Sequence, residues 1–458
     1  MLRILKFHSI NLLEKLPKCS LYRQKKHFTF LNHFITIQSI FFIVYRLGMK
    51  KVYLFVYVTC ILCLSSCYNS MGSCSLSEMD STTLKIKIGE INNKELLYSD
   101  VYTGVNYTIL ETNNESAIGN IEKLEVTSNK DFIVFDRANG KILRFDSTGI
   151  FLNKIGMMGH SKEEYINPEL MAYDEFNDNV IVYDGAKKSL LHYALNGTLV
   201  HTTSLHKYIA DFGVVNGEEI AICANYRDIV EKGKVAYNLE IINREGNILK
   251  QYDPYSIEKE KYRPSPTNIF KRNDGKLLFH KYYTPVIYTL DSDSAGIYPS
   301  FFLDFMSKQI PSDWLDLSTA EEIDHLIFNK ESDVIYCTEL YDTPRKYIVN
   351  ATSSNGSLFS IYIDKNNSSM QLSGNTMFND IYGLISSYIS CYKQDKVYCV
   401  INPEIVNNYF SAVSNTKEFD NYKKHLQEKG YNITEKDVYI LEKMKDNQNP
   451  IVQICTLK

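Results

Sequence analysis

The feature of this sequence that most constrains the fold is a segment that returns without gaps 48 residues later. Residues 132–156 (FIVFDRANGKILRFDSTGIFLNKIG) correspond to residues 180–200 (VIVYDGAKKSLLHYALNGTLV), so that Asp136 aligns with Asp184. Both segments have the pattern of short strands separated by turns rich in Asn, Gly and Asp. A strand-built repeat of this length buries little alone and must stack on its neighbours, which predicts the blades of a β-propeller.

Turn glycines extend the repeat along the chain. Gly149, Gly197 and Gly246 follow one another at intervals of 48 and 49 residues, and another turn near residues 295–296 comes at a similar interval. Beyond that turn the strands are separated by longer loops. We therefore expect six blades, which cover residues 121–156, 170–205, 219–246, 276–296, 333–364 and 388–457.

The expected fold is thus all-β: a six-bladed β-propeller of four-stranded antiparallel blades over residues 84–458, with short helical insertions. A ring of blades must also be locked, and the simplest lock pairs an N-terminal strand with C-terminal strands in one blade. We expect Val105–Glu111 (VNYTILE) to pair with Ile451–Leu457 for this purpose. A capping-box pattern from Ser318 to Glu321 predicts one helix, and residues 407–429 predict one or two more.

A membrane-targeting signal precedes the expected propeller. Met49-Lys50-Lys51 is a short basic start, and residues 52–64 (VYLFVYVTCILCL) are apolar over about the length of a signal h-region. The run ends in LSSC, which resembles a bacterial lipobox and predicts a lipoprotein signal peptide over residues 49–67, with lipidation at Cys67. Residues 68–83 would then form a flexible tether. The alternative is an ordinary secretory signal with an incidental cysteine.

The first 48 residues do not fit this scheme. They carry eight Lys and Arg residues against one acid, Glu14, and residues 28–45 are apolar but interrupted by polar side chains. We expect translation to start at Met49, which would make residues 1–48 an over-extended N-terminus. The alternative is an additional membrane segment, which would leave the lipobox unprocessed.

Composition and charge exclude some function classes. The net charge is −4 and the pI about 6.2, so there is no basic field for nucleic-acid binding. The sequence contains no GxSxG, HExxH, P-loop or dinucleotide-binding motif. We therefore expect no cofactor and no metal, and we identify no catalytic residue.

Six of the ten cysteines would remain beyond Cys67, and they lack the spacing of a zinc site. Cys391 and Cys399 flank an expected hairpin turn, so a cross-strand disulfide would be possible in an oxidising compartment. The simpler interpretation is that they are buried and act as small hydrophobic residues.

The blade segments resemble NHL-type β-propeller repeats, and the chain resembles the six-bladed β-propeller lipoproteins of Bacteroidetes. The resemblance rests on residues 105–126, the two matched blades and the ending NQNPIVQICTLK. Members of that family often carry a GxGPxEY-like segment after the first blade. Gly156, Gly159, Glu164 and Tyr165 fit this pattern, although the central Gly-Pro is replaced. The resemblance implies that Gly159, Glu164 and Tyr165 contribute loop contacts.

Several polar residues have both a functional and a structural interpretation. Asp136 and Asp184 could face the channel as metal ligands, but their recurrence at a strand end favours turn-capping carboxylates. His160 could act as an acid or base, but a solvated loop position is simpler. His201 and His206 have no acidic partner at ligand spacing and are interpreted as surface residues.

The chain contains 34 Tyr and a single Trp, Trp314. The tyrosines could form a stacking platform for sugars or peptides, but most occupy strand positions, where packing between blades is the simpler interpretation. Trp314 precedes the expected helix and is a candidate exposed contact. A lid that packs on the propeller explains it equally well.

These observations predict an outer-membrane lipoprotein of the cell envelope, facing the periplasm or the surface. Its propeller would be a binding or scaffold module for an unknown protein, peptide or glycan, anchored to the membrane by lipid. The alternative is a propeller hydrolase or lyase with a metal in the central channel. That function requires acidic or histidine side chains from several blades to converge on one point.

Overall fold

The computed structural model describes most of residues 79–458, and before them only residues 73, 74 and 76. The longer gaps are 228–233, 257–268, 382–388 and most of 403–448, and the shorter ones are 92–94, 274, 292, 294–295, 317–318, 330 and 368–370. The chain divides into two compact units, residues 1–74 and 75–458. The only element described in the first unit is the strand β1 (Ser73–Cys74).

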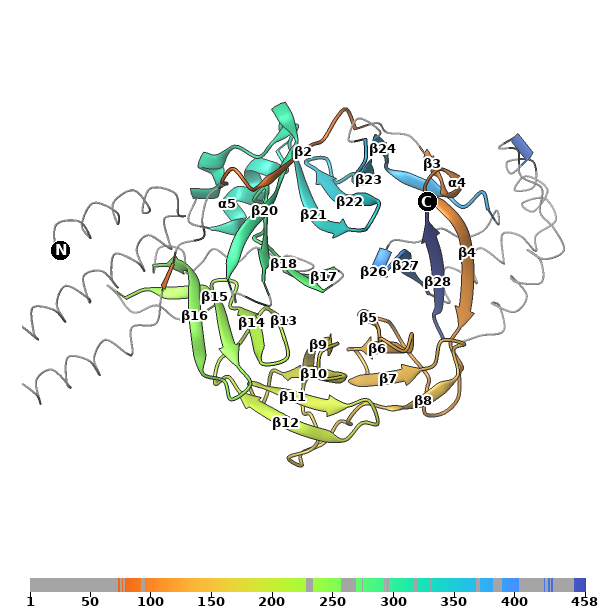
Figure 1. The fold of residues 1–458 in the computed structure, drawn as a ribbon, viewed down its shortest axis with the longest axis vertical. Coiled ribbons are helices and arrows are strands. Elements are labelled where there is room, and N and C mark those ends of the chain that lie inside the picture. The colour runs from red at the N-terminus through yellow and green to blue at the C-terminus, as the bar shows by residue number, and fades with distance from the viewer. Residues whose placement is uncertain are drawn as a thin grey trace, which may run out of the picture. The chain divides into compact units, whose positions relative to one another are not determined.

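The second unit is a six-bladed β-propeller, as predicted (Figure 1). Each blade is an antiparallel sheet that runs from an innermost to an outermost strand. Blades one to three are β5 (Lys123–Val126), β6 (Phe132–Asp136), β7 (Lys141–Phe145), β8 (Phe151–Lys154); β9 (Pro168–Asp174), β10 (Asn179–Asp184), β11 (Ser189–Ala194), β12 (Leu199–Ser204); and β13 (Asp211–Val214), β14 (Glu219–Cys223), β15 (Ala236–Asn243), β16 (Ile248–Tyr255).

The remaining three blades have the same order of strands. They are β17 (Phe270–Asn273), β18 (Lys276–His280), β19 (Val286–Leu290), β20 (Ile297–Asp304); β21 (Ile335–Asp342), β22 (Lys346–Ser353), β23 (Leu358–Asp364), β24 (Gln371–Gly374); and β26 (Ile389–Lys393), β27 (Lys396–Ile401), β28 (Ile451–Leu457), β4 (Tyr102–Ile109). Apolar clusters lie between neighbouring blades, so each blade is buried on both faces.

The repeated turn glycines have a steric reason. Gly149, Gly197 and Gly246 have φ values of 93°, 90° and 87°, a region that side chains rarely adopt. A Cβ atom on Gly197 would also lie 2.4 Å from the carbonyl oxygen of Lys154, at the end of the outermost strand of the preceding blade. Gly149 and Gly246 meet the preceding blade's backbone in the same way. The 48-residue glycine spacing therefore records how each blade fits against the blade before it.

The ring is closed by the predicted lock. In blade six, β4 pairs antiparallel with β28, with Val105 opposite Cys455 and Ile109 opposite Ile451. One N-terminal strand and three C-terminal strands thus form a single sheet. Hydrogen bonds along this sheet hold the two ends of the propeller together.

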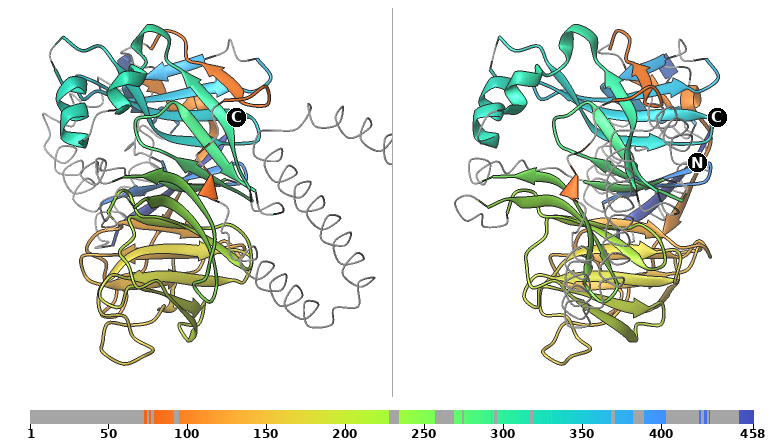
Figure 2. Two further views of the ribbon diagram at one scale, coloured as in Figure 1. Left: turned by 90° about the vertical axis from the view of Figure 1, so that its left-hand side faces the viewer. Right: turned by 60° about the vertical axis from the view of Figure 1, so that its left-hand side comes forward.

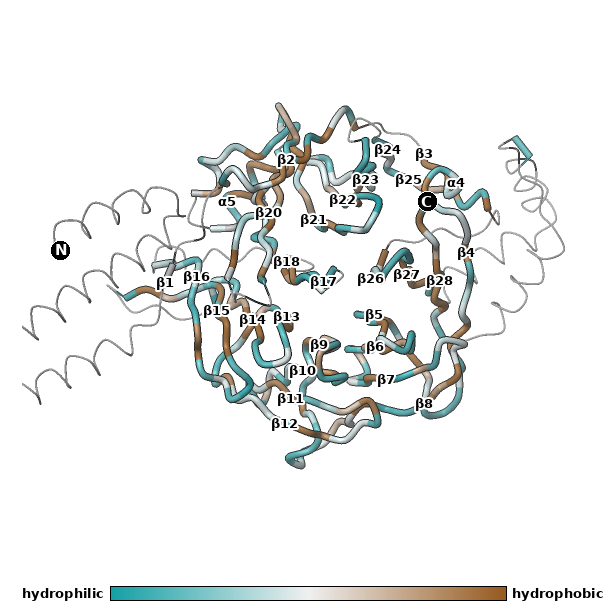
Figure 3. Tube along the Cα trace, in the orientation of Figure 1, coloured by the Kyte–Doolittle hydropathy of each residue, from teal (hydrophilic) through white to brown (hydrophobic). Residues whose placement is uncertain are grey.

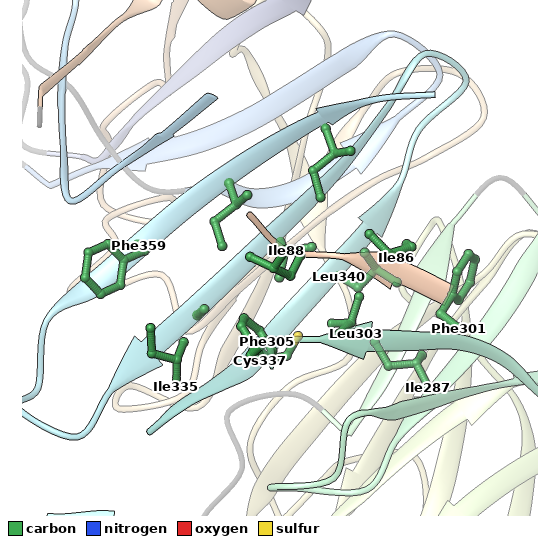
Figure 4. Packing of buried hydrophobic residues seen from close by; sticks show 14 of the residues in the cluster. Ile86, Ile88, Ile287, Phe301, Leu303, Phe305, Ile335, Cys337, Leu340 and Phe359 are labelled. Carbon is green, nitrogen blue, oxygen red and sulfur yellow. The ribbon is translucent and has the colours of Figure 1, made fainter. Parts of the chain in front are cut away.

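The segment that precedes β4 forms a strap along three blades, which the sequence pattern did not predict. Its strand β2 (Leu84–Lys87) pairs in parallel with β20 of blade four, and β3 (Glu95–Leu97) pairs in parallel with β25 (Thr376–Phe378) after blade five. The short helix α4 (Tyr98–Val101) then leads into β4. Ile86 and Ile88 of the strap are buried with residues of blades four and five, including Phe301, Leu303 and Leu340 (Figure 4).

An insertion between blades four and five contains 3₁₀ turns η3 (Met306–Lys308) and η4 (Ser312–Asp316) and the helix α5 (Ala320–Ile327). It lies at the outside of the strands of these blades (Figure 2). The predicted helix is present, but its cap is one residue later than expected: Thr319 Oγ1 accepts a hydrogen bond from the Glu322 amide at 3.2 Å. Ile323 and Ile327 are buried, as the apolar pattern requires.

The predicted signal peptide, Cys67 and the 1–48 extension lie outside the described residues, as do half of the tether residues and almost all of the helices expected in 407–429. Within the described part of the chain, no helix has the length and hydrophobicity needed to span a membrane.

Candidate functional site

The innermost strands of the six blades surround a cavity of about 250 Å³. Side chains from every blade line it, and hydrophilic residues are present among β5, β17 and β26 around the centre (Figure 3). Four lysine or arginine residues and four glutamates are among them: Lys123, Lys271, Arg272, Lys393, Glu122, Glu125, Glu175 and Glu339. The cavity therefore carries both signs of charge in equal number, and we treat it as the candidate binding site.

On the wall formed by blades four and five, the charges are paired with each other. Lys271 Nζ lies 3.2 Å from Glu339 Oε1, and these side chains are only 19% and 13% exposed. The Tyr341 hydroxyl and the Asn350 amide both donate to Glu339 Oε2, at 3.0 and 3.1 Å. Burial alone would raise the pKa of Glu339, but Lys271 and these hydrogen bonds hold it below its ordinary value.

Arg272 extends this network to blades two and three. Its guanidinium donates to Glu175 Oε1 at 3.2 Å and to the carbonyl oxygen of Val214. It also lies over the Phe176 ring, 5.0 Å from the centroid. The donors of Arg272 are thus directed at the protein, and this side chain joins three blades.

The wall formed by blades one and six is more accessible. Lys123 Nζ lies 3.4 Å from Glu125 Oε1, and these side chains are 34% and 27% exposed. Lys393 Nζ of blade six donates to the carbonyl oxygen of Val126 at 3.0 Å, and it lies 5.6 Å from the centroid of the Tyr173 ring. This wall therefore presents a carboxylate and two ammonium groups with fewer protein partners than the Lys271–Glu339 pair.

A half-buried thiol, Cys391, also lines the cavity. Burial raises its pKa, and Glu125 raises it further, so the thiol stays protonated at neutral pH. Cys391 is opposite Tyr398 in the register of β26 and β27, whereas Cys399 is opposite Ile389. Since successive residues of a strand face opposite sides, the possible Cys391–Cys399 disulfide is not formed, and both cysteines are free.

The predicted loop contacts lie away from this cavity and support the loop after blade one. Tyr165 is buried and packs edge-on against Tyr193, with ring centroids 6.1 Å apart. Glu164 accepts a hydrogen bond from the Ser161 amide at 2.9 Å. A Cβ atom on Gly159 would lie 1.9 Å from the Glu164 carboxylate, so a side chain at this position would displace the end of Glu164. The structure thus gives Gly159 and Tyr165 packing roles, and Tyr165 is not available as a surface contact.

Trp314 lies in η4, partly buried against an aromatic and aliphatic cluster beneath the insertion. Tyr283 and Tyr336 belong to this cluster, and their ring centroids are 5.1 Å apart. Trp314 was interpreted either as an exposed contact or as part of a lid that packs on the propeller, and its partly buried position fits the lid. The tyrosines of this cluster are likewise packed against each other.

Asp136 and Asp184 are buried turn-capping carboxylates, as the structural interpretation predicted. Asp136 Oδ2 accepts from the Gly119 amide at 2.7 Å, and Asp184 Oδ2 accepts from the Ile166 amide at 2.7 Å. Each also accepts from backbone amides of the turn that follows it. Because Gly119 and Ile166 precede the innermost strands of blades one and two, these carboxylates fasten each inner strand to its own blade.

Two of the three histidines considered in the sequence are exposed as predicted, and the third is not. His160 and His206 are exposed, as expected. His201 is half-buried instead: its Nε2 lies 2.9 Å from the Arg244 carbonyl oxygen, and its ring packs edge-on against His192. His192 is buried, and desolvation together with the Arg244 charge lowers its pKa to about 3. His192 is therefore a neutral packing residue between blades two and three.

No three His, Cys, Asp or Glu side chains of the described residues converge in a way that could hold a metal ion. The carboxylates of the cavity contact lysine or arginine instead.

Inspection of the sequence missed the charged residues of the cavity. The signal was weak but present, because each of the strands β5, β17, β21 and β26 contains a charge within an otherwise apolar or alternating run, as in KLEV (123–126) and FKRN (270–273). The same pattern is typical of a strand with one solvated face. The pattern alone therefore does not distinguish a channel wall from an outer surface.

The chain was compared with family models, curated proteins and solved structures. A family model described as "Domain of unknown function (DUF4934)" matches residues 83–456. No curated protein matches the chain. A crystal structure of a Bacteroides fragilis protein described as exported is similar, with 16% identity and a TM-score of 0.62, covering 82% of this chain and 100% of that chain.

Two further solved structures are more distant. A DUF4221 family member from Bacteroides vulgatus has 10% identity and a TM-score of 0.43, covering 78% of this chain and 97% of its own. Virginiamycin B lyase from Staphylococcus aureus has 8% identity and a TM-score of 0.34, covering 64% of this chain and 94% of its own. The match to the family model shows the family, and the Bacteroides fragilis structure shares the fold, whereas the resemblance to NHL-type repeats stays a prediction.

Proposed function

This chain belongs to the DUF4934 family, and from that premise we propose that it is a lipid-anchored β-propeller of the cell envelope that binds a small ligand in its central channel. The observation that carries the proposal is the cavity of about 250 Å³, to which all six blades contribute side chains. Proteins hold small ligands in concave sites on which polar groups from several elements converge.

The proposed location rests on the sequence before the propeller. Residues 49–67 contain a basic start, an apolar run and the LSSC ending in the order of a lipoprotein signal. Lipidation of Cys67 with several acyl chains would anchor the mature chain firmly to a membrane. The structurally similar Bacteroides fragilis protein is described as exported, which agrees with this location.

A binding function is favoured over catalysis by how the cavity charges are paired. Glu339, Glu175 and Glu125 each lie within 3.4 Å of a lysine or arginine nitrogen, an arrangement that neutralises charge. A metal-dependent hydrolase or lyase would need three or more ligands at one point, and among the described residues such a group is not present. The partners we propose are the membrane, through lipid, and a ligand of peptide or glycan chemistry.

The lipid anchor can be tested directly in cells. We expect the full chain expressed in a Bacteroides host to incorporate an alkyne-labelled fatty acid and to fractionate with membranes. Cys67→Ala should abolish the label, whereas Cys74→Ala, seven residues later, should retain it. Labelling that persists in the Cys67→Ala variant would exclude this anchor.

Channel binding can be tested on the same protein, extracted from membranes. We expect native mass spectrometry to detect a small molecule that copurifies with the propeller. Ala172→Leu, which fills the cavity wall, should displace this molecule, whereas Ala186→Leu at an exposed position should not. Equal ligand occupancy in both variants would show that the channel is not the binding site.

A further inference from the structure

We propose that the ligand of the central channel is a zwitterion, a free amino acid or short peptide whose ammonium group meets Glu125 and whose carboxylate meets Lys393. This inference rests on the proposed channel-binding function and specifies the chemistry of the ligand. It is carried by three properties of the cavity: its charge balance, the partners of each charge, and its size.

The charges that line the cavity are balanced. The cavity is lined by four carboxylates and by four lysine or arginine side chains. A ligand with one net charge would lose its hydration on entry and leave the cavity unbalanced, which is costly in a partly desolvated site. A ligand that carries one charge of each sign can bring each group next to its opposite without changing the net charge. Complementary placement of charge favours such a ligand over a phosphate or a polyamine.

The partners of each charge decide where the ligand groups would bind. Lys271 and Glu339 contact each other and Tyr341, and Arg272 is directed at Glu175 and at a backbone carbonyl. Lys393 differs from them, because among the described residues its ammonium donates one hydrogen bond, to Val126. An ammonium group can donate three. Lys393 therefore has capacity to bind a carboxylate without breaking a contact between blades.

A carboxylate, Glu125, lines the same cavity on the neighbouring strand β5. Lys393 is bonded to the carbonyl of Val126, the residue that follows Glu125 on β5. Glu125 contacts Lys123 at 3.4 Å, and its side chain is 27% exposed, about twice the value for Glu339. A carboxylate has several acceptor sites, so Glu125 can accept from a ligand ammonium while it keeps the contact with Lys123. The two groups thus lie on adjacent strands of neighbouring blades, and both line the cavity.

The size and lining of the cavity limit the rest of the ligand. A volume of about 250 Å³ is below the usual range for drug-sized ligands, roughly 300–1,000 Å³, and suits one or two amino-acid residues. Leu124, Phe212 and Val214 are apolar members of the lining, each at most 2% exposed, and Ala172 and Gly213 keep the wall of blades two and three shallow. An extended glycan would bring many hydroxyl groups to a wall with few unused polar partners.

The experiment is calorimetric titration of the membrane-extracted mature chain with alanyl-leucine, together with its N-acetylated and C-amidated forms. We expect the free dipeptide to bind and each blocked form to bind at least about tenfold more weakly, the loss of one charge-assisted contact of about 1.4 kcal/mol. The Glu125→Gln variant should bind the N-acetylated dipeptide as tightly as the free dipeptide. The Lys393→Met variant should bind the C-amidated dipeptide as tightly as the free dipeptide. Surface variants Glu115→Gln and Lys162→Met should match the wild type.

The outcomes separate this inference from the proposed function. If the blocked and free dipeptides bind equally, or if none binds while Ala172→Leu still displaces a copurified molecule of another class, the zwitterion proposal is wrong and channel binding stands. If no dipeptide binds and no copurified molecule responds to Ala172→Leu, both proposals fail. The zwitterion proposal is supported specifically if Glu125→Gln no longer distinguishes the N-acetylated from the free dipeptide and Lys393→Met no longer distinguishes the C-amidated from the free dipeptide. Circular dichroism would verify that both variants are folded.

Discussion

The two walls of the central channel contain the same types of charged residue, yet the protein uses them differently. On the wall of blades four and five, Lys271 and Glu339 are 19% and 13% exposed and are bonded to each other and to Tyr341. On the wall of blades one and six, Lys123 and Glu125 are 34% and 27% exposed. The first wall joins blades, and the second retains polar groups that a ligand could use.

A local irregularity in the backbone accompanies this difference. The pairing of β21 with β22 shifts register between Cys337 and Glu339, so that Thr338 is an extra residue on β21. Such a bulge bends the strand and redirects the side chains beside it. Glu339 thereby reaches both Lys271 of blade four and Asn350 of its own blade. In blade one, β5 pairs with β6 without a shift, and Glu125 stays at the cavity surface.

The largest expected effect comes from breaking the buried pair. Glu339→Ala removes the partner of a largely buried ammonium, and we expect a loss of about 3 kcal/mol in the free energy of unfolding. Urea denaturation followed by tyrosine fluorescence would measure it. The matched variant Glu125→Ala on the other wall should cost less than about 1 kcal/mol. Similar losses in both variants would mean that the two walls do not differ.

A double variant sharpens this comparison. Replacing both partners, in Lys271→Met with Glu339→Leu, removes the uncompensated charge that each single change leaves behind. We expect the double variant to be more stable than Glu339→Ala by about 2 kcal/mol, since apolar replacements of buried pairs are often close to neutral. The same denaturation experiment tests this, and additive losses would contradict it.

Acid should weaken the contribution of Glu339, on the wall of blades four and five, to the stability of the fold. The pKa of Glu339 in the folded protein lies below its ordinary value of 4.5, so its carboxylate stabilises the fold above that pH. This contribution is lost as the pH falls below 4.5 and through the lowered pKa. Glu339→Gln should therefore flatten the decline of stability in this acidic range. Melting temperatures of this variant and of the wild type across the range would show it.

A smaller effect is expected at the junction of blades six and one. Lys393→Met removes a hydrogen bond to the Val126 carbonyl oxygen, and we expect a cost of about 1 kcal/mol. Lys393→Arg should retain most of this stability, because a guanidinium can donate to the same oxygen. Thermal denaturation would measure the stability of both variants. A stability loss in Lys393→Met larger than that in Glu339→Ala would mean that the wall of blades one and six, and not that of blades four and five, joins the blades more strongly.

The smallest effect is expected from Glu125→Gln. This change keeps the shape of the side chain and removes only a half-exposed contact with Lys123, so the unfolding free energy should change by no more than about 0.5 kcal/mol. Its effect on ligand binding should be much larger than its effect on stability. A stability loss above about 2 kcal/mol would show that Glu125 is a structural residue like Glu339.

Much of the fold was predictable because the repeat records local geometry. The turn glycines, the capping carboxylates Asp136 and Asp184 and the closing strand all act within one blade or between consecutive blades. The strap was not predictable in the same way. Four residues of β2 (LKIK) pair with a strand more than 200 residues later, and so short an alternating segment does not specify its partner.

None of the charged side chains of the proposed site was predicted from the sequence. Tyr165 was expected to be a loop contact because residues 156–165 resemble a GxGPxEY-like segment, whereas its ring is buried against Tyr193. His201 appeared solvated because no acid lies nearby in sequence, whereas its partner is a backbone carbonyl of Arg244 in the next blade. Both depend on contacts between blades, which the periodicity of one blade does not reveal.

The number of blades, their turns and the strand that closes the ring follow from residue spacing and from residues that tolerate or cap particular backbone shapes, so they could be predicted from the amino-acid sequence. Which charged residues join blades and which remain at the cavity surface depends on how the blades are arranged in the ring. Lys271 and Glu339 lie 68 residues apart and meet because the blades curve into a ring. Burial then strengthens their attraction, whereas the wetter Lys123–Glu125 contact stays weak.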